Sequence, residues 1–387
     1  MKKPTFVIIS LIMICIGSSQ DFTTKWVNGY KLTSSDGEHS LKFGGRIMYD
    51  YATWNTGNET QAGTEFRRVR FFNSGKVYGN IKYKLQLDFA GGGVSFKDVY
   101  IEAALPYVGN FKVGHFKEPF RLEVLTSSKY ITFMERGLPI AFSPERNVGF
   151  MLHNSFMDDK LSVQAGLFRE AEKDSPGNDT NIDNVNNITA RLTFLPINDR
   201  GNLLHLGAGF SSRHTSNQKY SISTRPENHL GTKLLNMELD SVSGMNLIGA
   251  EMAFVMGSFS VQGEYVMNSV KGVEGYSFSG YYGQLSYFLT GEKRKYKNSL
   301  AGFDRVIPNS NMKEGEGWGS LELAARYSSM DLSEAHAGVL NDITIGLNWY
   351  LNPCARVMFN YVMGTLEDHD GKETTENTFQ CRIQIDF

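Results

Sequence analysis

The stretch from Lys112 to Asn147 holds the charged side chains best suited to bind a solute in this 387-residue chain. It interleaves aromatic residues with arginines, lysines and glutamates, and after an opening strand end it shows neither a period of two nor a helical stripe. Long loops without regular structure are uncommon and often functional. A loop facing only water would not need the aromatic residues. We therefore expect residues 118–147 to fold back onto the protein and present their cations; an ordinary surface loop with salt bridges is the alternative.

The elements that must position this loop are β-strands. Apolar and polar residues alternate with a period of two, which indicates strands with one apolar and one polar face. Clear examples are 41–51, 82–89, 98–105, 161–169, 188–194, 204–210, 259–267, 321–327, 343–349 and 357–363. Weaker candidates are 66–73, 109–116, 148–156, 246–256, 278–290 and 379–387. These make about sixteen strands, many near the length of about ten residues that a tilted membrane strand needs.

The connections between these strands alternate between short and long. The short ones are 73–77, 106–109, 157–160, 196–202, 257–258 and 351–353, and the long ones are 55–63, 118–147, 171–185, 213–244, 332–340 and 367–375. Outer-membrane barrels have short periplasmic turns and longer outer loops. A soluble β-sandwich also alternates, but it rarely needs so many long strands. The exception is 291–317, a long basic connection on the short-turn side.

Both ends of the chain agree with an outer-membrane barrel. Lys2 and Lys3 precede an apolar run too short to span a bilayer, and small residues follow it. We expect a signal peptide at 1–19, a periplasmic segment at 20–40 and the barrel at 41–387. The last strand ends on Phe387, which resembles the signal read by outer-membrane assembly machinery. Cys354 and Cys381 are too far apart in the expected pairing for a disulfide.

No pattern in the sequence points to catalysis, a metal or a cofactor. The sequence lacks HExxH, GxSxG and P-loop motifs, and its eight histidines show no metal-ligand spacing. The net charge of −2 does not indicate a nucleic-acid partner, so any electrostatic specificity must come from local groups of charges. We expect no enzymatic activity, although a barrel enzyme and an adhesive barrel remain alternatives.

In a membrane barrel the apolar face points to lipid and the polar face lines the lumen. Alternation places Arg46 and Asp98 inside, and sixteen strands enclose an aqueous channel. Inward folding of the loop would narrow this channel. It would also bring four cations to the constriction: Lys117, Arg121, Lys129 and Arg136. Cations at a constriction favour the passage of anions. The alternative for each charge is an ordinary ion pair across the lumen wall.

Several motifs resemble the phosphate-selective porin O/P family, in order along nearly the whole mature chain. They are GGR at 44–46, EFRRVRF at 65–71, KYKLQLDFA at 82–90, FKDVYIE at 96–102, GHFKEPF at 114–120, LTSSKYITFMER at 125–136, GYYGQLSYFLTGE at 280–292, GLNWY at 346–350 and the terminal phenylalanine. The resemblance implies a trimeric, sixteen-stranded outer-membrane channel whose third outer loop folds inward. It also implies an anion-conducting pore lined by arginine and lysine.

The resemblance adds residues and two departures. Arg46, the Arg67–Arg68 doublet, Asp98 and Arg136 fall where family members place pore charges. A regular strand cannot turn both Arg67 and Arg68 inward unless a bulge re-aims one of them. Val124 stands where the best-studied members have lysine. Residues 213–244 lack those members' run of arginines.

The sequence therefore predicts a porin in the outer membrane of a Gram-negative bacterium, for passive uptake of small anions with phosphate or polyphosphate as candidates. A general non-selective porin is the alternative. The expected partners are small anions, outer-membrane lipid, two further copies of the chain and the assembly machinery. We expect six cations and four anions in the lumen, and this small surplus predicts a mild anion preference. The cations are Arg46, Arg68, Lys117, Arg121, Lys129 and Arg136, and the anions are Asp98, Glu118, Glu123 and Glu135.

Overall fold

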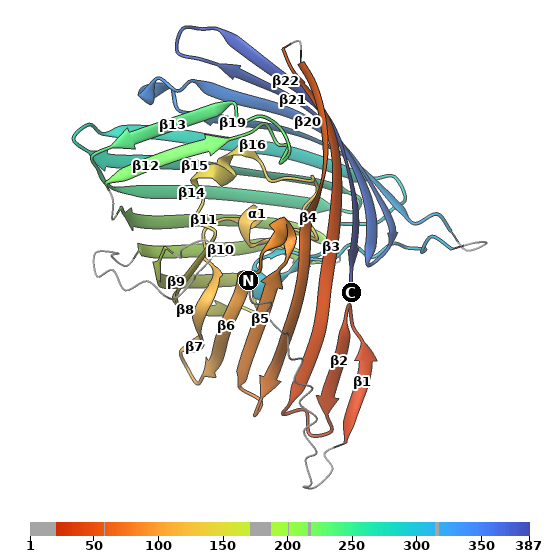
Figure 1. The fold of residues 1–387 in the computed structure, drawn as a ribbon. Helices are drawn as coiled ribbons and strands as arrows, with labels where there is room; N and C mark the ends of the chain where they lie inside the picture. Colours follow the sequence, from red (N-terminus) through yellow and green to blue (C-terminus); the bar gives the residue numbers. More distant parts are fainter. Residues whose placement is uncertain (1–20, 58, 171–186, 200, 216–217, 314–316) are drawn as a thin grey trace, which may run out of the picture.

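The computed structural model describes residues 21–57, 59–170, 187–199, 201–215, 218–313 and 317–387 (Figure 1). The predicted signal peptide at 1–19 and the predicted loop at 171–185 lie outside the described residues. No helix in the described ranges is long and apolar enough to cross a bilayer.

Within the described residues, sixteen antiparallel strands close into one barrel (Figure 1). Each strand pairs with its neighbour in sequence, and the ring closes where the last strand pairs with β3, from Glu376 opposite Thr56 to Asp386 opposite Arg46. The predicted all-β barrel of about sixteen strands is confirmed.

The barrel strands vary in length around the ring. They are β3 Ser40–Thr56, β4 Glu59–Val77, β5 Ile81–Asp88, β6 Ser95–Leu105, β7 Gly109–Lys117, β8 Arg146–Phe156, β9 Leu161–Arg169, β10 Asn187–Asp199, β11 Asn202–His214, β14 Val242–Met256, β15 Phe259–Gly272, β16 Tyr276–Phe288, β19 Ser320–Asp331, β20 Val339–Asn352, β21 Ala355–Glu367 and β22 Glu373–Asp386. Short elements lie between and before them: β1 Phe22–Trp26, β2 Tyr30–Ser34, α1 Leu122–Leu125, β12 Lys219–Thr224, β13 Leu235–Asp240, β17 Tyr296–Lys297, β18 Gly302–Phe303 and the 3₁₀ turns Ala90–Gly92, Leu138–Phe142, Asn298–Leu300 and Ser333–Ala335.

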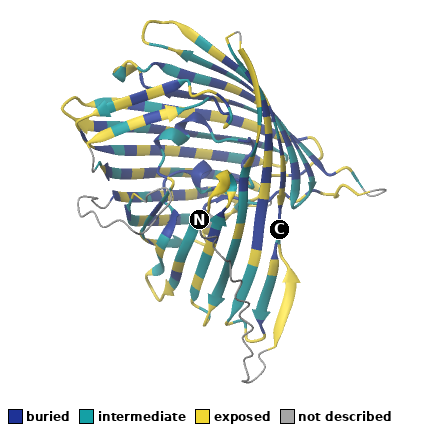
Figure 2. Cartoon of the chain, viewed as in Figure 1, coloured by how far each residue is buried: buried dark blue, intermediate teal, exposed yellow. Residues whose placement is uncertain are grey.

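The period of two sorts the side chains to the two faces of the wall. On β20, Ile343 and Ile345 are 47% and 54% exposed, whereas Thr344 between them is 1% exposed. Figure 2 shows the same bands of exposed and buried residues along most strands. The apolar face therefore points outward and the polar face points into the barrel, as lipid outside and water inside require.

Three predicted long connections are shorter than expected. Strands β3 and β4 continue to Thr56 and Glu59, so the predicted loop at 55–63 is a tight hairpin; the loops predicted at 332–340 and 367–375 are also shortened by strand ends. Around 55–63 polar residues occupy both faces, so the apolar alternation fades there while the hydrogen-bonded ladder continues.

The predicted periplasmic segment at 20–40 contains a hairpin, β1–β2. Strand β2 pairs with the first residues of β3, along the same edge that β22 occupies farther on (Figure 1). The chain end lies between them, because Gly45 and Phe387 exchange backbone hydrogen bonds of 2.7 and 3.2 Å. A Cβ atom at Gly44 would lie 2.5 Å from the Phe387 carbonyl oxygen, so glycine is required there.

Cys354 and Cys381 are free thiols, as predicted.

Candidate functional site

A cavity of about 1160 Å³ opens between the wall formed by β3–β8 and two inner segments, 125–146 and 223–229. Eleven cations and six carboxylates from the described residues line it, so positive charge predominates. The cations are Arg46, Arg67, Arg68, Arg70, Lys84, Lys97, Lys112, Lys117, Arg136, Arg146 and Arg225, and the carboxylates belong to Glu65, Asp88, Asp98, Glu135, Glu145 and Glu227.

The first of these segments belongs to residues 118–147, which we call the inner loop. Its main chain is tied to strands remote from β7 and β8, the two strands that it connects. Arg356 of β21 donates to the Ile131 carbonyl at 2.9 Å, and Asn348 of β20 donates to the Thr132 carbonyl at 2.8 Å. The Leu138 N–H donates to Ser328 of β19 at 3.0 Å. The inner loop therefore crosses the space that the barrel encloses (Figure 1).

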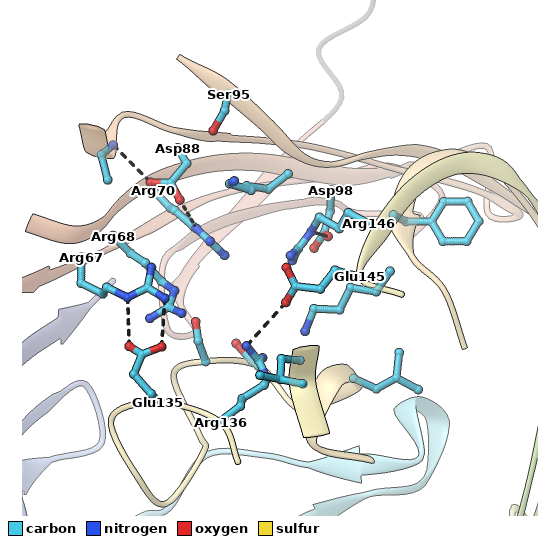
Figure 3. A pocket seen from close by; sticks show the side chains of 18 of the residues that line it. Arg67, Arg68, Arg70, Asp88, Ser95, Asp98, Glu135, Arg136, Glu145 and Arg146 are labelled. Atoms are coloured by element: carbon cyan, nitrogen blue, oxygen red, sulfur yellow. Dashed lines mark hydrogen bonds and ion pairs between the residues drawn. The ribbon is translucent and has the colours of Figure 1, made fainter. Parts of the chain in front are cut away.

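The arginine doublet meets the inner loop through a β-bulge. The pairing of β3 with β4 shifts between Met48, which faces Arg68, and Tyr49, which faces Phe66, so Arg67 is the extra residue. Both arginines therefore line the cavity (Figure 3). Arg67 donates two parallel hydrogen bonds of 2.9 Å to Glu135 of the inner loop. The bulge thus answers which arginine faces inward: both do.

Four cations of the cavity wall form no ion pair with any carboxylate of the described residues: Arg46, Arg68, Lys97 and Lys117. Arg46 donates to the hydroxyls of Ser127 and Ser128 at 3.3 and 2.8 Å. Arg68 donates a hydrogen bond to the Met48 sulfur, at 3.7 Å. Lys117 donates to backbone carbonyls of the inner loop, among them Thr126 at 3.3 Å. None of these cations is bonded to a carboxylate, so they are available to an anion.

Other cavity charges cancel one another. Asp98 accepts from Lys84 at 2.6 Å and from Arg146 at 2.7 Å, and Asp88 accepts from Arg70 at 2.7 Å (Figure 3). These pairs keep the wall side chains in place. Their net charge is small, one positive charge in excess where two cations share Asp98.

Arg136 is held mainly by the backbone of the inner loop. It donates to the Glu123 carbonyl at 2.9 Å and the Thr126 carbonyl at 3.1 Å, while the nearest oxygen of Glu145 is 3.9 Å away (Figure 3). Its charge is therefore only loosely compensated.

Two predicted site residues lie outside the cavity lining. Arg121 is 1% exposed and donates to Glu264 of β15 at 2.5 Å. Lys129 donates to Asp386 of β22 at 3.0 Å. Both anchor the inner loop, and the other six predicted residues line the cavity.

Two carboxylates of the inner loop, Glu135 and Glu145, have pKa values lowered by these cations. Burial disfavours the charged form of Glu135, but Arg67, Arg68 and Arg382 outweigh it and hold the pKa well below its usual range. In the same way Arg136, Arg146 and Lys117 outweigh burial and lower the pKa of Glu145 to about 2.

Several lining residues were not predicted from the sequence. Lys97 lines the cavity beside Asp98 because the pairing of β5 with β6 is irregular between Leu85 and Leu87, and no sequence signal marks that shift. Arg225 belongs to the second inner segment, whose Glu227 receives a hydrogen bond from Arg326 of β19 at 2.9 Å. The long connection at 213–244 was the only signal for it.

One described group has ligand atoms close enough to hold a metal ion, within 4.8 Å of one another: Asp368, His369 and Asp370. It lies at an exposed turn and does not line the cavity.

A family model for phosphate-selective porins O and P matches residues 41–387. Porin O of Pseudomonas aeruginosa is 28% identical over 429 aligned residues, covering 95% of this chain and 93% of that protein. An uncharacterised protein of Caulobacter vibrioides is also 28% identical, covering 94% of this chain and 76% of its own length.

Solved structures share the fold at low identity. An anion-selective porin from Comamonas acidovorans has a TM-score of 0.56 at 12% identity, covering 90% of this chain and all of that one. The outer membrane channel DcaP of Acinetobacter baumannii has a TM-score of 0.57 at 10% identity, covering 91% of this chain and 99% of that one. The trimer form of OmpT from Vibrio cholerae has a TM-score of 0.54 at 12% identity, covering 90% and 99%.

Proposed function

The chain belongs to the phosphate-selective porin O and P family, and we propose that it conducts small anions through the lumen of its barrel. It is an outer-membrane porin of a Gram-negative bacterium, in keeping with its family, with its relative Porin O and with its lipid-facing strands. The observation that carries the proposal is the cavity wall, where Arg46, Arg68 and Lys117 face the lumen without a carboxylate partner.

The inner loop is proposed as the constriction of this channel. Its cations and those of the facing wall act across a narrow, low-dielectric space, where charges interact more strongly and are less screened than in bulk water. An anion there would replace its hydration with guanidinium and hydroxyl donors, and the planar fork of arginine suits oxyanions such as phosphate.

Selectivity for phosphate is proposed to be weak. The family's best-studied members carry lysine where this chain has Val124, whose side chain is fully buried here. Lys117 and Arg136 both donate to the Val124 carbonyl, the latter at 3.5 Å. They bring positive charge near that position, but some of their hydrogen-bond donors bind the backbone and are not free for phosphate. A general anion porin with slight phosphate binding is therefore favoured over a strictly selective one.

The test is the reversal potential of the purified channel in a salt gradient across a planar bilayer. The native channel should prefer anions, more strongly at low salt. One lumen charge favours an anion and disfavours a cation by about 0.6 kcal/mol or more each at about 7 Å, so Arg46→Ala or Arg68→Ala should each reduce the anion-to-cation permeability ratio about sevenfold. Lys160→Ala, at an exposed turn outside the cavity, is the control. Cation preference in the native channel would contradict the proposal.

Phosphate binding is tested separately, by adding phosphate to a chloride solution and measuring the chloride current. Weak binding predicts partial block that only millimolar phosphate produces, and Arg68→Ala should remove it. Tight block at micromolar phosphate would show a selective site that these contacts do not account for.

We further propose a homotrimer, because family resemblance implies one and the trimer form of OmpT shares the fold. Chemical cross-linking in detergent should give a ladder ending at three chains. A single band at the mass of one chain would contradict the proposed trimer.

A further inference from the structure

The connection between β16 and β19 also enters the barrel, from the end opposite to the inner loop. We call residues 291–306 the lower segment. Its side chains alternate between the inward-facing Glu292, Arg294 and Tyr296, the first two buried and the third half-buried, and exposed lysines. Arg294 lies 3.5 Å over the Phe303 ring and donates to Gln262 of β15 at 3.0 Å, so the buried side of the segment packs on the polar face of the wall.

The lower segment and the inner loop meet along a seam. Leu122 of α1 belongs to one apolar cluster with Phe303, and Tyr296 packs against that cluster. The backbone N–H of the same Phe303 donates to the Thr126 hydroxyl at 3.3 Å. The two segments therefore share both apolar and polar contacts, although the chain enters them from opposite ends of the barrel.

One carboxylate joins the two segments at the end of this seam. Asp386, the penultimate residue, is 2% exposed. It accepts from Lys129 of the inner loop at 3.0 Å and from both terminal nitrogens of Arg305 of the lower segment, one of them at 3.1 Å. Arg305 also donates to the Tyr130 hydroxyl at 3.2 Å. Among the ion pairs of the described residues, no other carboxylate binds a cation from each of these two segments.

The same junction lies beside Arg46, one of the cavity cations that has no carboxylate partner. Asp386 lies directly opposite Arg46 in the pairing of β22 with β3. Lys129 follows Ser127 and Ser128, whose hydroxyls receive the Arg46 guanidinium. A displacement of Lys129 would therefore move the two hydroxyls that orient Arg46.

We propose that Asp386 is a positioning residue of the channel, which pins the inner loop to the lower segment so that the two behave as one rigid constriction. This inference rests on the proposed function. Without the carboxylate, Lys129 and Arg305 would lose the hydrogen-bond acceptor that joins the two segments. The seam would then open at this end, and the constriction would fluctuate.

The test is single-channel recording of Asp386→Asn beside the native protein. Loss of the pin predicts a several-fold increase in open-channel current noise and frequent partial closures. Arg305→Gln breaks the same junction from the lower segment and leaves the C-terminal strand intact, so it carries the test if Asp386→Asn does not assemble. Both variants should be noisy.

Charge and position are separated by a double variant. Asp386→Asn with Arg305→Gln removes one charge of each sign and keeps the net charge of the lumen. A positioning role predicts that the double variant stays noisy, whereas a purely electrostatic role predicts native behaviour. Asp88→Asn is the matched control, because Asp88 is a cavity carboxylate that pairs with Arg70 of the wall and not with the inner loop. It should change selectivity without adding noise.

Quiet, native-like channels from both Asp386→Asn and Arg305→Gln would overturn the inference, and so would native behaviour of the double variant. Neither result would touch the proposed function, which stands or falls on the selectivity of the native channel. A native channel that prefers cations would refute the function even if the junction variants were noisy.

Discussion

At the scale of the residue, function depends on which charges lack a partner and not on how many are present. Asp98 and Glu135 each hold cations in place, whereas Arg46 and Arg68 donate to hydroxyls and to a sulfur atom, respectively, and not to a carboxylate. The net field that an entering anion meets therefore comes from a minority of the cations in the lumen. Arg121 illustrates the other role, because its buried pair with Glu264 anchors the inner loop.

Glu135 should keep its charge at mildly acidic pH. Its pKa is held well below the usual range by the arginines around it, even though burial acts in the opposite direction. A lowered pKa means that the carboxylate loses its charge only at a pH far below its ordinary value of about 4.3. The selectivity difference between the native channel and Glu135→Gln should therefore be the same at pH 7 and pH 4.

Reversal potentials of the two proteins at both pH values measure this difference. If Glu135 titrated at its ordinary pKa of about 4.3, about two thirds of the difference would vanish at pH 4. The amount of folded barrel on an unheated gel serves as the control, because removing one partner of a buried ion pair costs about 3–5 kcal/mol.

At the scale of the element, two irregularities shape the cavity more than the regular strands do. The bulge in β4 turns both Arg67 and Arg68 inward, and the irregular pairing of β5 with β6 brings Lys97 beside Asp98. Regular alternation would have sent one residue of each pair to the lipid face, where a charge is costly. The inner loop then supplies the facing side of the cavity.

Deleting residues 121–135 should widen the channel and leave the barrel intact. The strands close their own hydrogen-bond ladder, so the wall does not need the inner loop. Arg382 would keep Asp50 as a partner, at 2.7 Å. Single-channel conductance should rise at least about twofold, since a sixteen-stranded barrel without a plug encloses a wide aqueous lumen. Unchanged conductance would show that the inner loop does not limit the current.

At the scale of the whole molecule, the protein is a closed cylinder whose outer face is apolar and whose inner face is crossed by ion pairs. The closing seam between β22 and β3 matters most, because the terminal Phe387 and the Gly44–Gly45 pair meet there. Closure leaves the barrel no free edge through the membrane.

The closed barrel should be heat-modifiable. Without boiling, the purified protein should run on a detergent gel at a different position from the boiled chain, and its far-UV circular dichroism should be dominated by β-structure. Gly44→Val should abolish the folded band, because a side chain there meets the Phe387 carbonyl oxygen and the Phe72 ring within 2.6 Å. Gly37→Val, at a site with no atom within 4 Å, has a positive φ of 71° and tests backbone strain alone. A helical spectrum would contradict the fold.

The sequence by itself determined the barrel, its strand count and which face is apolar. These features are local, because the pleat forces side chains to alternate and the membrane makes the two faces differ. It could not determine the loop lengths at the outer ends, since 55–63 loses its alternation there while the backbone ladder continues. Nor could it show that both arginines of the doublet face the lumen, because a bulge depends on the partner strand.

Only the tertiary structure decided which charges are compensated. The pair of Arg67 with Glu135 joins residues 68 positions apart, and that of Arg382 with Asp50 joins residues 332 apart. Sequence alone placed Arg121 and Lys129 at the constriction with Arg136, whereas their partners Glu264 and Asp386 hold them against the wall. An ion pair is set by distances across the closed barrel, and no local pattern encodes those distances.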